Sequence, residues 1–115
     1  AVPKNKKHGV SVEIQMQSNG INVQQLKTMI DQKVIKLIDV RENFEIQRDG
    51  SIENSIHVPY AQIENFFKNI ELTQSNEKFV LYCHTGQRTY LALQKLKNGN
   101  IHHLVGGISN CIDAA

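Results

Sequence analysis

The fold of this chain is decided by residues 78–89, which read KFVLYCHTGQRT. The apolar run Lys78–Tyr82 predicts a buried strand, and the loop Cys83–Arg88 follows it. Apolar residues then recur at helical spacing over Thr89–Lys97, which predicts a helix. A strand that leads through a short loop into a helix is the repeating unit of a parallel sheet with right-handed crossovers. This stretch therefore indicates an α/β domain.

The same alternation extends toward both ends of the chain. Val34–Val40 reads VIKLIDV, a β-branched run typical of a strand buried on both faces. Asn22 is expected to cap the helix that follows it. The further expected strands are Val10–Met16, Ser55–Val58 and Ile101–Val105, and the further expected helices are Val23–Asp31, Arg41–Arg48 and Ala61–Ile70. These elements predict a three-layer α/β domain whose central, mostly parallel sheet is flanked by helices.

The length of 115 residues fits one domain. We expect residues 1–20 to be an N-terminal tail or linker with at most one short strand, which Ser18-Asn19-Gly20 ends, and residues 21–115 to form the domain. The chain starts at Ala1 without a methionine, which fits either a processed start or a domain excerpted from a longer protein.

Composition excludes several classes of protein. Hydrophobic residues make up 40% of the chain and charged residues 21%, as in globular domains rather than disordered tails or coiled coils. The apolar stretches are too short to cross a bilayer, and the first residues lack the apolar segment of a secretory signal. Two cysteines make no disulfide framework, so a cytoplasmic location is expected.

The charge of the chain predicts no nucleic-acid partner. The net charge is +2, and three of the 13 lysines and arginines lie in the first ten residues, which hold no acid. The remainder has 10 basic against 11 acidic residues, or −1, and no basic stripe.

Cys83 is the candidate for chemistry. It follows a buried strand and precedes a loop with one glycine, Gly86, and a helix start. Backbone N–H groups of the loop and the positive end of the helix would favour a thiolate there, and Arg88 adds a fixed positive charge. A lone cysteine is most often an inert small hydrophobic residue. An inert cysteine, however, needs neither Gly86 nor Arg88.

Four motifs in chain order resemble those of the rhodanese family of sulfurtransferases. They are LIDVRE at residues 37–42, GSIENSIHVP at residues 50–59, VLYCHTGQRT at residues 80–89 and LVGGI at residues 104–108. The resemblance covers the chain from about Ile21 to Asp113. It implies a rhodanese fold in which Cys83 accepts sulfane sulfur and becomes a persulfide.

The resemblance also implies an active-site loop that holds the transferred sulfur. Its substrate-binding residues are His84, Thr85, Gly86, Gln87 and Arg88. The Cys83 thiolate would attack the outer sulfur of a donor such as thiosulfate, and cyanide or an acceptor thiol would then take the sulfur. Arg88 is expected either to attract an anionic donor or to pair with a carboxylate. Thr85 and Thr89 are candidates for hydrogen bonds to the persulfide, with capping of the helix as the alternative for Thr89.

Loop length separates this reaction from that of a related class of enzymes. Cysteine phosphatases, some of which share this fold, place five residues between cysteine and arginine. Here four residues separate Cys83 from Arg88. The smaller ring suits a single sulfur atom and argues for sulfur transfer.

Other motif residues are expected to support the loop. Asp39 and Arg41 fit an ion pair or an amide anchor beside it, and His57 fits a packed, hydrogen-bonded histidine. Asn54 stands where the family often has glycine and can adopt a left-handed conformation. Cys111 fits a packing residue better than a second reactive thiol.

We expect no metal and no other cofactor. His102 and His103 are adjacent on a strand, so their side chains point to opposite faces and cannot share one metal ion. The chain has no Cys-x-x-Cys pair. The expected partners are a small-molecule sulfur donor and a thiol or cyanide acceptor.

Two other functions remain open on the sequence. One is a sulfur-relay domain of a larger protein, either an adenylyltransferase that loads sulfur-carrier proteins or a flavin-dependent disulfide reductase, whose pattern Gly86, Arg88, Tyr90 and Ala92 resemble. The other is a non-catalytic binding module. Such modules usually lose the cysteine that is present here, so this function ranks last.

Overall fold

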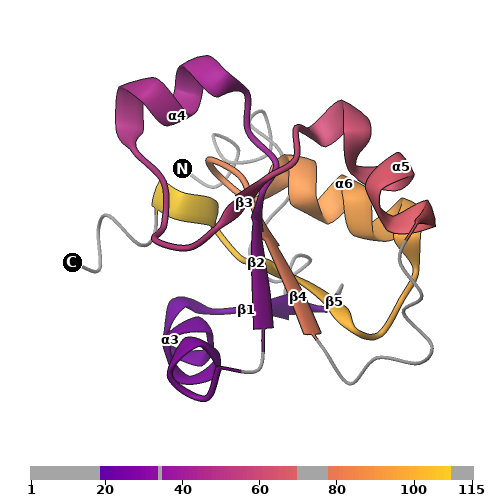
Figure 1. The fold of residues 1–115 in the computed structure, drawn as a ribbon. Helices are drawn as coiled ribbons and strands as arrows, with labels where there is room; N and C mark the ends of the chain where they lie inside the picture. The colour runs from indigo at the N-terminus through magenta and orange to yellow at the C-terminus, as the bar shows by residue number, and fades with distance from the viewer. Residues whose placement is uncertain (1–18, 34, 70–77, 110–115) are drawn as a thin grey trace, which may run out of the picture.

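A computed structural model describes residues 19–33, 35–69 and 78–109 of the chain (Figure 1). Its strands are β1 (Gly20–Ile21), β2 (Ile35–Asp39), β3 (Ile56–His57), β4 (Lys78–Tyr82) and β5 (Ile101–Leu104). Its helices are α3 (Val23–Asp31), α4 (Asn43–Asp49), the 3₁₀ helix η1 (Tyr60–Gln62), α5 (Ile63–Lys68) and α6 (Gln87–Leu96). The predicted strand Val10–Met16 lies outside the described residues.

The five strands form one sheet in the order β1-β5-β4-β2-β3, and every pair is parallel. The α/β architecture predicted from the sequence is therefore confirmed. Strands β2 and β4 are paired along their whole length, and their last residues, Asp39 and Tyr82, lie opposite each other. Because parallel strands end at the same edge of a sheet, the loops that follow β2 and β4 are neighbours.

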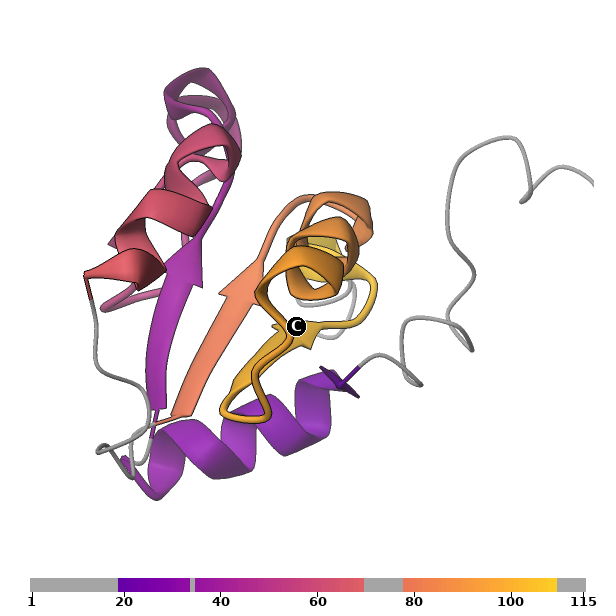
Figure 2. The same cartoon turned by 90° about the vertical axis from the view of Figure 1, so that its right-hand side faces the viewer.

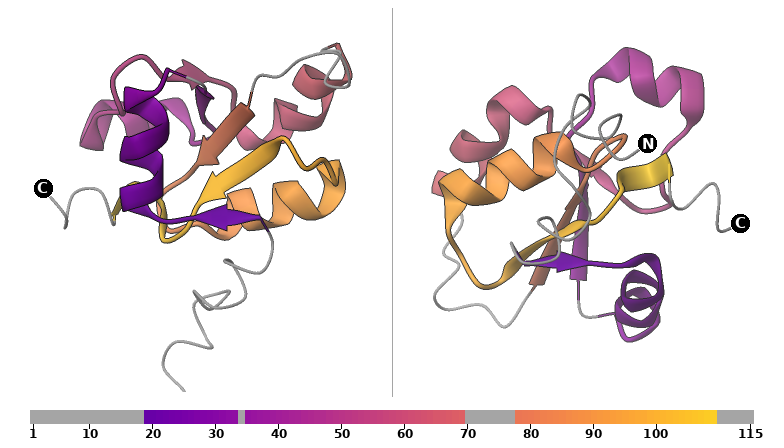
Figure 3. Two further views of the ribbon diagram at one scale, coloured as in Figure 1. Left: turned by 90° about the horizontal axis from the view of Figure 1, so that it is seen from below. Right: turned by 180° about the vertical axis from the view of Figure 1, so that it is seen from behind.

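Helices cover both faces of the sheet (Figure 3). Side chains alternate along β4: Phe79 and Leu81 pack with residues of α5 and α6, whereas Val80 and Tyr82 pack with Leu26 of α3. Helix α4 lies beyond the carboxyl end of β2, on the same side as the loop after β4 (Figures 1 and 2). Among the described residues, no helix is both long and apolar enough to span a membrane.

Several boundaries differ from the prediction. The expected helix Arg41–Arg48 begins at Asn43, because Glu42 is its N-cap. The expected helix Ala61–Ile70 is divided into η1 and α5. Helix α6 begins two residues earlier than expected, because the left-handed Gly86 (φ 94°) turns the chain directly into the helix. Strand β1 begins at Gly20, inside the expected break, where Asn19 is left-handed and its side chain donates to the carbonyl of Ile101.

Candidate active site

Cys83 follows β4 directly and is 1% exposed. It continues the face of β4 that packs against α5 and α6. Its Sγ accepts a hydrogen bond from the backbone N–H of Gly86 at 3.1 Å. This N–H stands at the start of α6, where the helix dipole is positive. The sulfur is thus placed where a negative charge is favoured.

Backbone hydrogen bonds hold the loop after Cys83 to the segment that follows β5. The carbonyls of Cys83 and His84 accept hydrogen bonds from Ile108 N–H at 2.8 Å and Ser109 N–H at 3.1 Å. Gly107 is left-handed (φ 68°), and a Cβ there would overlap both carbonyl oxygens. The second glycine of the motif is therefore required by the close approach of two backbone segments.

Thr89 is fully buried beside the sulfur. Its Oγ1 lies 3.7 Å from Cys83 Sγ, 3.2 Å from the carbonyl oxygen of Gly86 and 2.9 Å from Nδ1 of His103. The hydroxyl therefore faces the sulfur and the first turn of its own helix at once, so both roles expected for Thr89 are compatible with its position.

Arg88 pairs with a carboxylate, which is one of the two arrangements expected for it. Its Nη1 and Nη2 donate to the two oxygens of Glu45 at 2.8 and 2.7 Å. Glu45 Oε2 also accepts from the backbone N–H of Glu42, in the capping box of α4. The hydrogen bonds from Arg88 lower the pKa of Glu45 from 4.5 to about 2, against the effect of burial. A charged pair therefore joins α4 to the active-site loop.

Asp39 and Arg41 form the expected ion pair. Arg41 Nη2 lies 2.7 Å from Asp39 Oδ2, and the Arg41 backbone N–H donates to Asp39 Oδ1 at 2.9 Å. Nη2 also donates to the carbonyl of Gly50 at 2.6 Å. Burial disfavours the charge on Arg41, but the hydrogen bonds and the charge of Asp39 outweigh it and raise the pKa of Arg41. The pair holds the turn after α4 rather than the sulfur.

The segment before β3 is fixed to the sheet through a tyrosine. Tyr82 Oη accepts from Ile52 N–H at 3.0 Å and lies 3.0 Å from Ser55 Oγ. Asn54 is left-handed (φ 67°), as expected for a residue in the place of glycine. His57 Nε2 donates to the carbonyl of Arg41 at 2.7 Å, so this histidine is hydrogen-bonded although its side chain is exposed.

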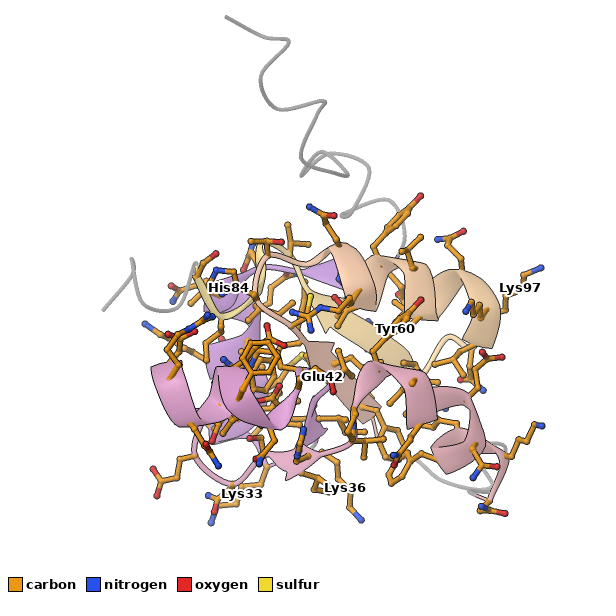
Figure 4. All side chains as sticks on the ribbon, turned by 90° about the horizontal axis from the view of Figure 1, so that it is seen from above. Lys33, Lys36, Glu42, Tyr60, His84 and Lys97 are labelled. Carbon is orange, nitrogen blue, oxygen red and sulfur yellow. The ribbon has the colours of Figure 1, made fainter. Side chains whose placement is uncertain are left out.

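The other predicted loop residues line the rim of the site. Figure 4 looks down on the carboxyl ends of the strands, where Glu42, Tyr60 and His84 come from three separate segments. His84 and Gln87 are half-buried, and Thr85 is exposed. His102 and His103 point to opposite faces of the sheet: His103 bonds Thr89 of α6, and His102 lies beside Met29 of α3. Cys111 lies outside the described residues.

Sequence reasoning missed two residues of this site. Glu45 was assigned no role from the sequence, although its Glu-x-x-Glu spacing from Glu42 matches a capping box and was a usable signal. His103 was considered only as a metal ligand, and nothing in the sequence links it to Thr89. Within residues 19–33, 35–69 and 78–109, no group of three His, Cys, Asp or Glu side chains is placed to hold a metal ion.

Known proteins resemble this chain in sequence and in structure. The family model "Rhodanese-like domain" matches residues 22–114. A rhodanese-related protein from Thermoplasma volcanium is 33% identical, with a TM-score of 0.72 over 84% of this chain and 93% of its own. No curated protein matches this chain.

Two more distant structures share the fold. The human single-domain sulfurtransferase TSTD1 is 17% identical, with a TM-score of 0.71 over 84% of this chain and 97% of its own. A protein from Rhodopseudomonas palustris, described as a possible tyrosine phosphatase, is 22% identical, with a TM-score of 0.72 over 91% of each chain. At these identities the likeness concerns the fold alone.

Proposed function

This chain belongs to the rhodanese-like domain family, and from that premise we propose that it is a sulfurtransferase that carries sulfane sulfur as a persulfide on Cys83. One observation carries the proposal: a buried Sγ at the carboxyl end of β4 accepts the N–H at the start of α6. A sulfur anion, whether thiolate or persulfide, is the species that such an N–H and helix dipole stabilise.

The reaction has two steps in which atoms and electrons balance. The Cys83 thiolate attacks the outer sulfur of thiosulfate, a new S–S bond forms, and the old S–S bond breaks with its electron pair on sulfite. An acceptor, either cyanide or a thiolate, then attacks the terminal sulfur of the persulfide. The bond to Sγ breaks, its electron pair returns to Cys83 as a thiolate, and the acceptor leaves with the sulfur.

Each residue of the active-site loop has its own role in this reaction. The Gly86 N–H holds the Cys83 sulfur at 3.1 Å, and the left-handed Gly86 allows the loop to turn into α6. Thr89 adds a hydroxyl at 3.7 Å from the same sulfur. Half-buried His84 and Gln87, with exposed Thr85, form the rim that a small donor or a thiol acceptor meets first. Arg88 holds the loop to α4 and contributes its charge from there.

Phosphate chemistry is the alternative with the same fold. A phosphoryl group requires a loop wide enough for three equatorial oxygens around the sulfur. The loop has four residues between Cys83 and Arg88, and Arg88 is engaged by both oxygens of Glu45. These features favour a single sulfur atom as the transferred group.

The test is the intact mass of the protein after incubation with thiosulfate. We expect one added sulfur atom on the wild type and on Cys111→Ser, removable by a thiol reductant, and none on Cys83→Ser. Hydrolysis of an aryl phosphate by the same preparations serves as the comparison reaction. Turnover of the phosphate that depends on Cys83, together with no added sulfur from thiosulfate or from a low-molecular-weight persulfide, would contradict the proposal.

A further inference from the structure

A buried chain of three polar side chains leads from the sulfur into the sheet. Cys83 Sγ lies 3.7 Å from Thr89 Oγ1, which lies 2.9 Å from Nδ1 of His103. None of the three residues is more than 1% exposed. Polar groups at such depth are costly unless they bond to each other, so this arrangement constrains where each proton lies.

The hydroxyl of Thr89 has one proton and three neighbours that compete for it. The carbonyl of Gly86, at 3.2 Å, only accepts hydrogen bonds. His103 Nδ1 accepts if it carries no proton and donates if it carries one. In the first case the Thr89 proton points at the imidazole, away from the sulfur. In the second case His103 donates to Oγ1, and the Thr89 proton is available to the sulfur.

A sulfur anion on Cys83 favours the arrangement in which the Thr89 hydroxyl donates to the sulfur. Hydrogen bonds to a charged acceptor are about twice as strong as those between neutral groups. A proton on Nδ1 of His103 therefore allows Thr89 to donate to the thiolate or persulfide, whereas an unprotonated Nδ1 withdraws that donor. The Gly86 N–H bonds the sulfur in either case.

We propose that His103 is a positioning residue, which, by donating from Nδ1 to Thr89, directs the Thr89 hydroxyl proton at the sulfur of Cys83. The inference rests on the proposed function, because it concerns the sulfur anion that the reaction uses. A residue of β5 would thereby affect the reactive sulfur in the loop that follows β4.

Among the described residues, Thr89 links His103 to the sulfur. In the strand register His103 lies opposite Gly20 of β1 and Leu81 of β4, neither of which carries a charge. From α6, the Tyr90 ring lies 6.4 Å from the imidazole in an edge-to-face arrangement. Arg88 is a charged group near the sulfur, and its pKa is raised first by its hydrogen bonds to Glu45 and also by negative charge on Cys83.

The first test measures the pH dependence of Cys83 alkylation in reduced protein that carries Cys111→Ser. We expect Thr89→Val and His103→Leu each to raise the pH of half-maximal alkylation by about one unit. The double variant should shift no further than either single one, because both remove the same hydrogen bond. Thr89→Ser and His103→Asn keep a hydroxyl and a donor, so they should restore the wild-type profile.

His102→Leu is the matched control, because it changes the neighbouring histidine on the opposite face of β5. It should leave the profile unchanged. The proposal fails if His103→Leu behaves like His102→Leu while Thr89→Val shifts the profile, or if the Thr89 and His103 shifts add in full.

A second test needs no variant and guards against loss of folding in His103→Leu. Nitrogen-15 NMR of the wild-type imidazole reports which ring nitrogen carries the proton. We expect a proton on Nδ1 of His103 when Cys83 is a thiolate, and its absence there overturns the proposal. Neither test involves a sulfur donor. A protein that never forms a persulfide would therefore refute the proposed function while leaving these two results interpretable.

Discussion

Two arginine–carboxylate pairs lie near the carboxyl ends of the neighbouring strands β2 and β4, and they differ in burial and in reach. Asp39 and Arg41 are two residues apart, and their side chains are 1% and 0% exposed. Glu45 and Arg88 are 43 residues apart in sequence, and their side chains are 9% and 31% exposed. One arginine–carboxylate pair is thus buried in the core, and the other is partly exposed beside the active-site loop.

The difference in burial gives the two pairs different roles. Buried Arg41 has no access to water, so its charge depends on Asp39, on the Gly50 carbonyl and on the Tyr82 ring beneath it. Arg88 is partly solvated and can exchange its carboxylate for water at modest cost. The first pair is therefore a fixed part of the core, whereas the second is a clasp between α4 and the active-site loop.

Matched isosteric substitutions separate the two roles, and the largest effect is expected at the buried pair. Asp39→Asn removes the charge and leaves Arg41 buried without a counterion. We expect the free energy of unfolding to fall by about 3–5 kcal/mol, measured by denaturant titration. A loss below about 1 kcal/mol would contradict the role of this pair in the core.

The two pairs also differ in how far the sequence predicts them. Asp39 and Arg41 lie in one short motif at the end of an apolar run, so their proximity follows from local geometry. The pairing of Glu45 with Arg88 depends on two strands being adjacent in the sheet, and no local pattern specifies this order. Periodicity gave the position of β4 and the helix Val23–Asp31 to the residue, because in both segments apolar spacing agrees with clear end signals.

The errors in the sequence prediction have the same origin as the missed pair. Strand β1 has only two residues and forms because β5 offers an open edge. His103 acquires its partner only when α6 packs over β5. In each case a tertiary neighbour supplies what the local sequence lacks.

A smaller effect is expected at the clasp. Glu45→Gln leaves Arg88 charged but able to reach water, so the free energy of unfolding should fall by about 1–2 kcal/mol. Amide hydrogen exchange should accelerate at residues 84–88 while β2 stays protected, because the clasp fixes the loop rather than the sheet. Uniform acceleration over the whole domain would show that the Glu45–Arg88 pair stabilises the whole fold, as the buried pair does, and not the loop alone.

The exposed pair of Lys95 and Glu64 provides the baseline for this comparison. Its charged atoms lie 3.7 Å apart, and both side chains are more than half exposed. Glu64→Gln should change the free energy of unfolding by less than about 0.5 kcal/mol. The expected order is therefore the buried pair, the clasp and then the surface pair.

The charge of Glu45 also makes the contribution of the clasp depend on pH. In the folded protein the pKa of Glu45 is lowered to about 2 from 4.5, so folding favours its charged form. This contribution to stability is fully present above pH 4.5 and is lost as the pH falls toward 2. Glu45→Gln lacks a titrating group at this position, so its deficit relative to wild type should be constant near neutral pH and shrink as the pH falls below 4.5. Denaturant titrations of both proteins at about pH 6 and about pH 3.5 measure this difference. An undiminished deficit at the lower pH would contradict a contribution from the charge of Glu45.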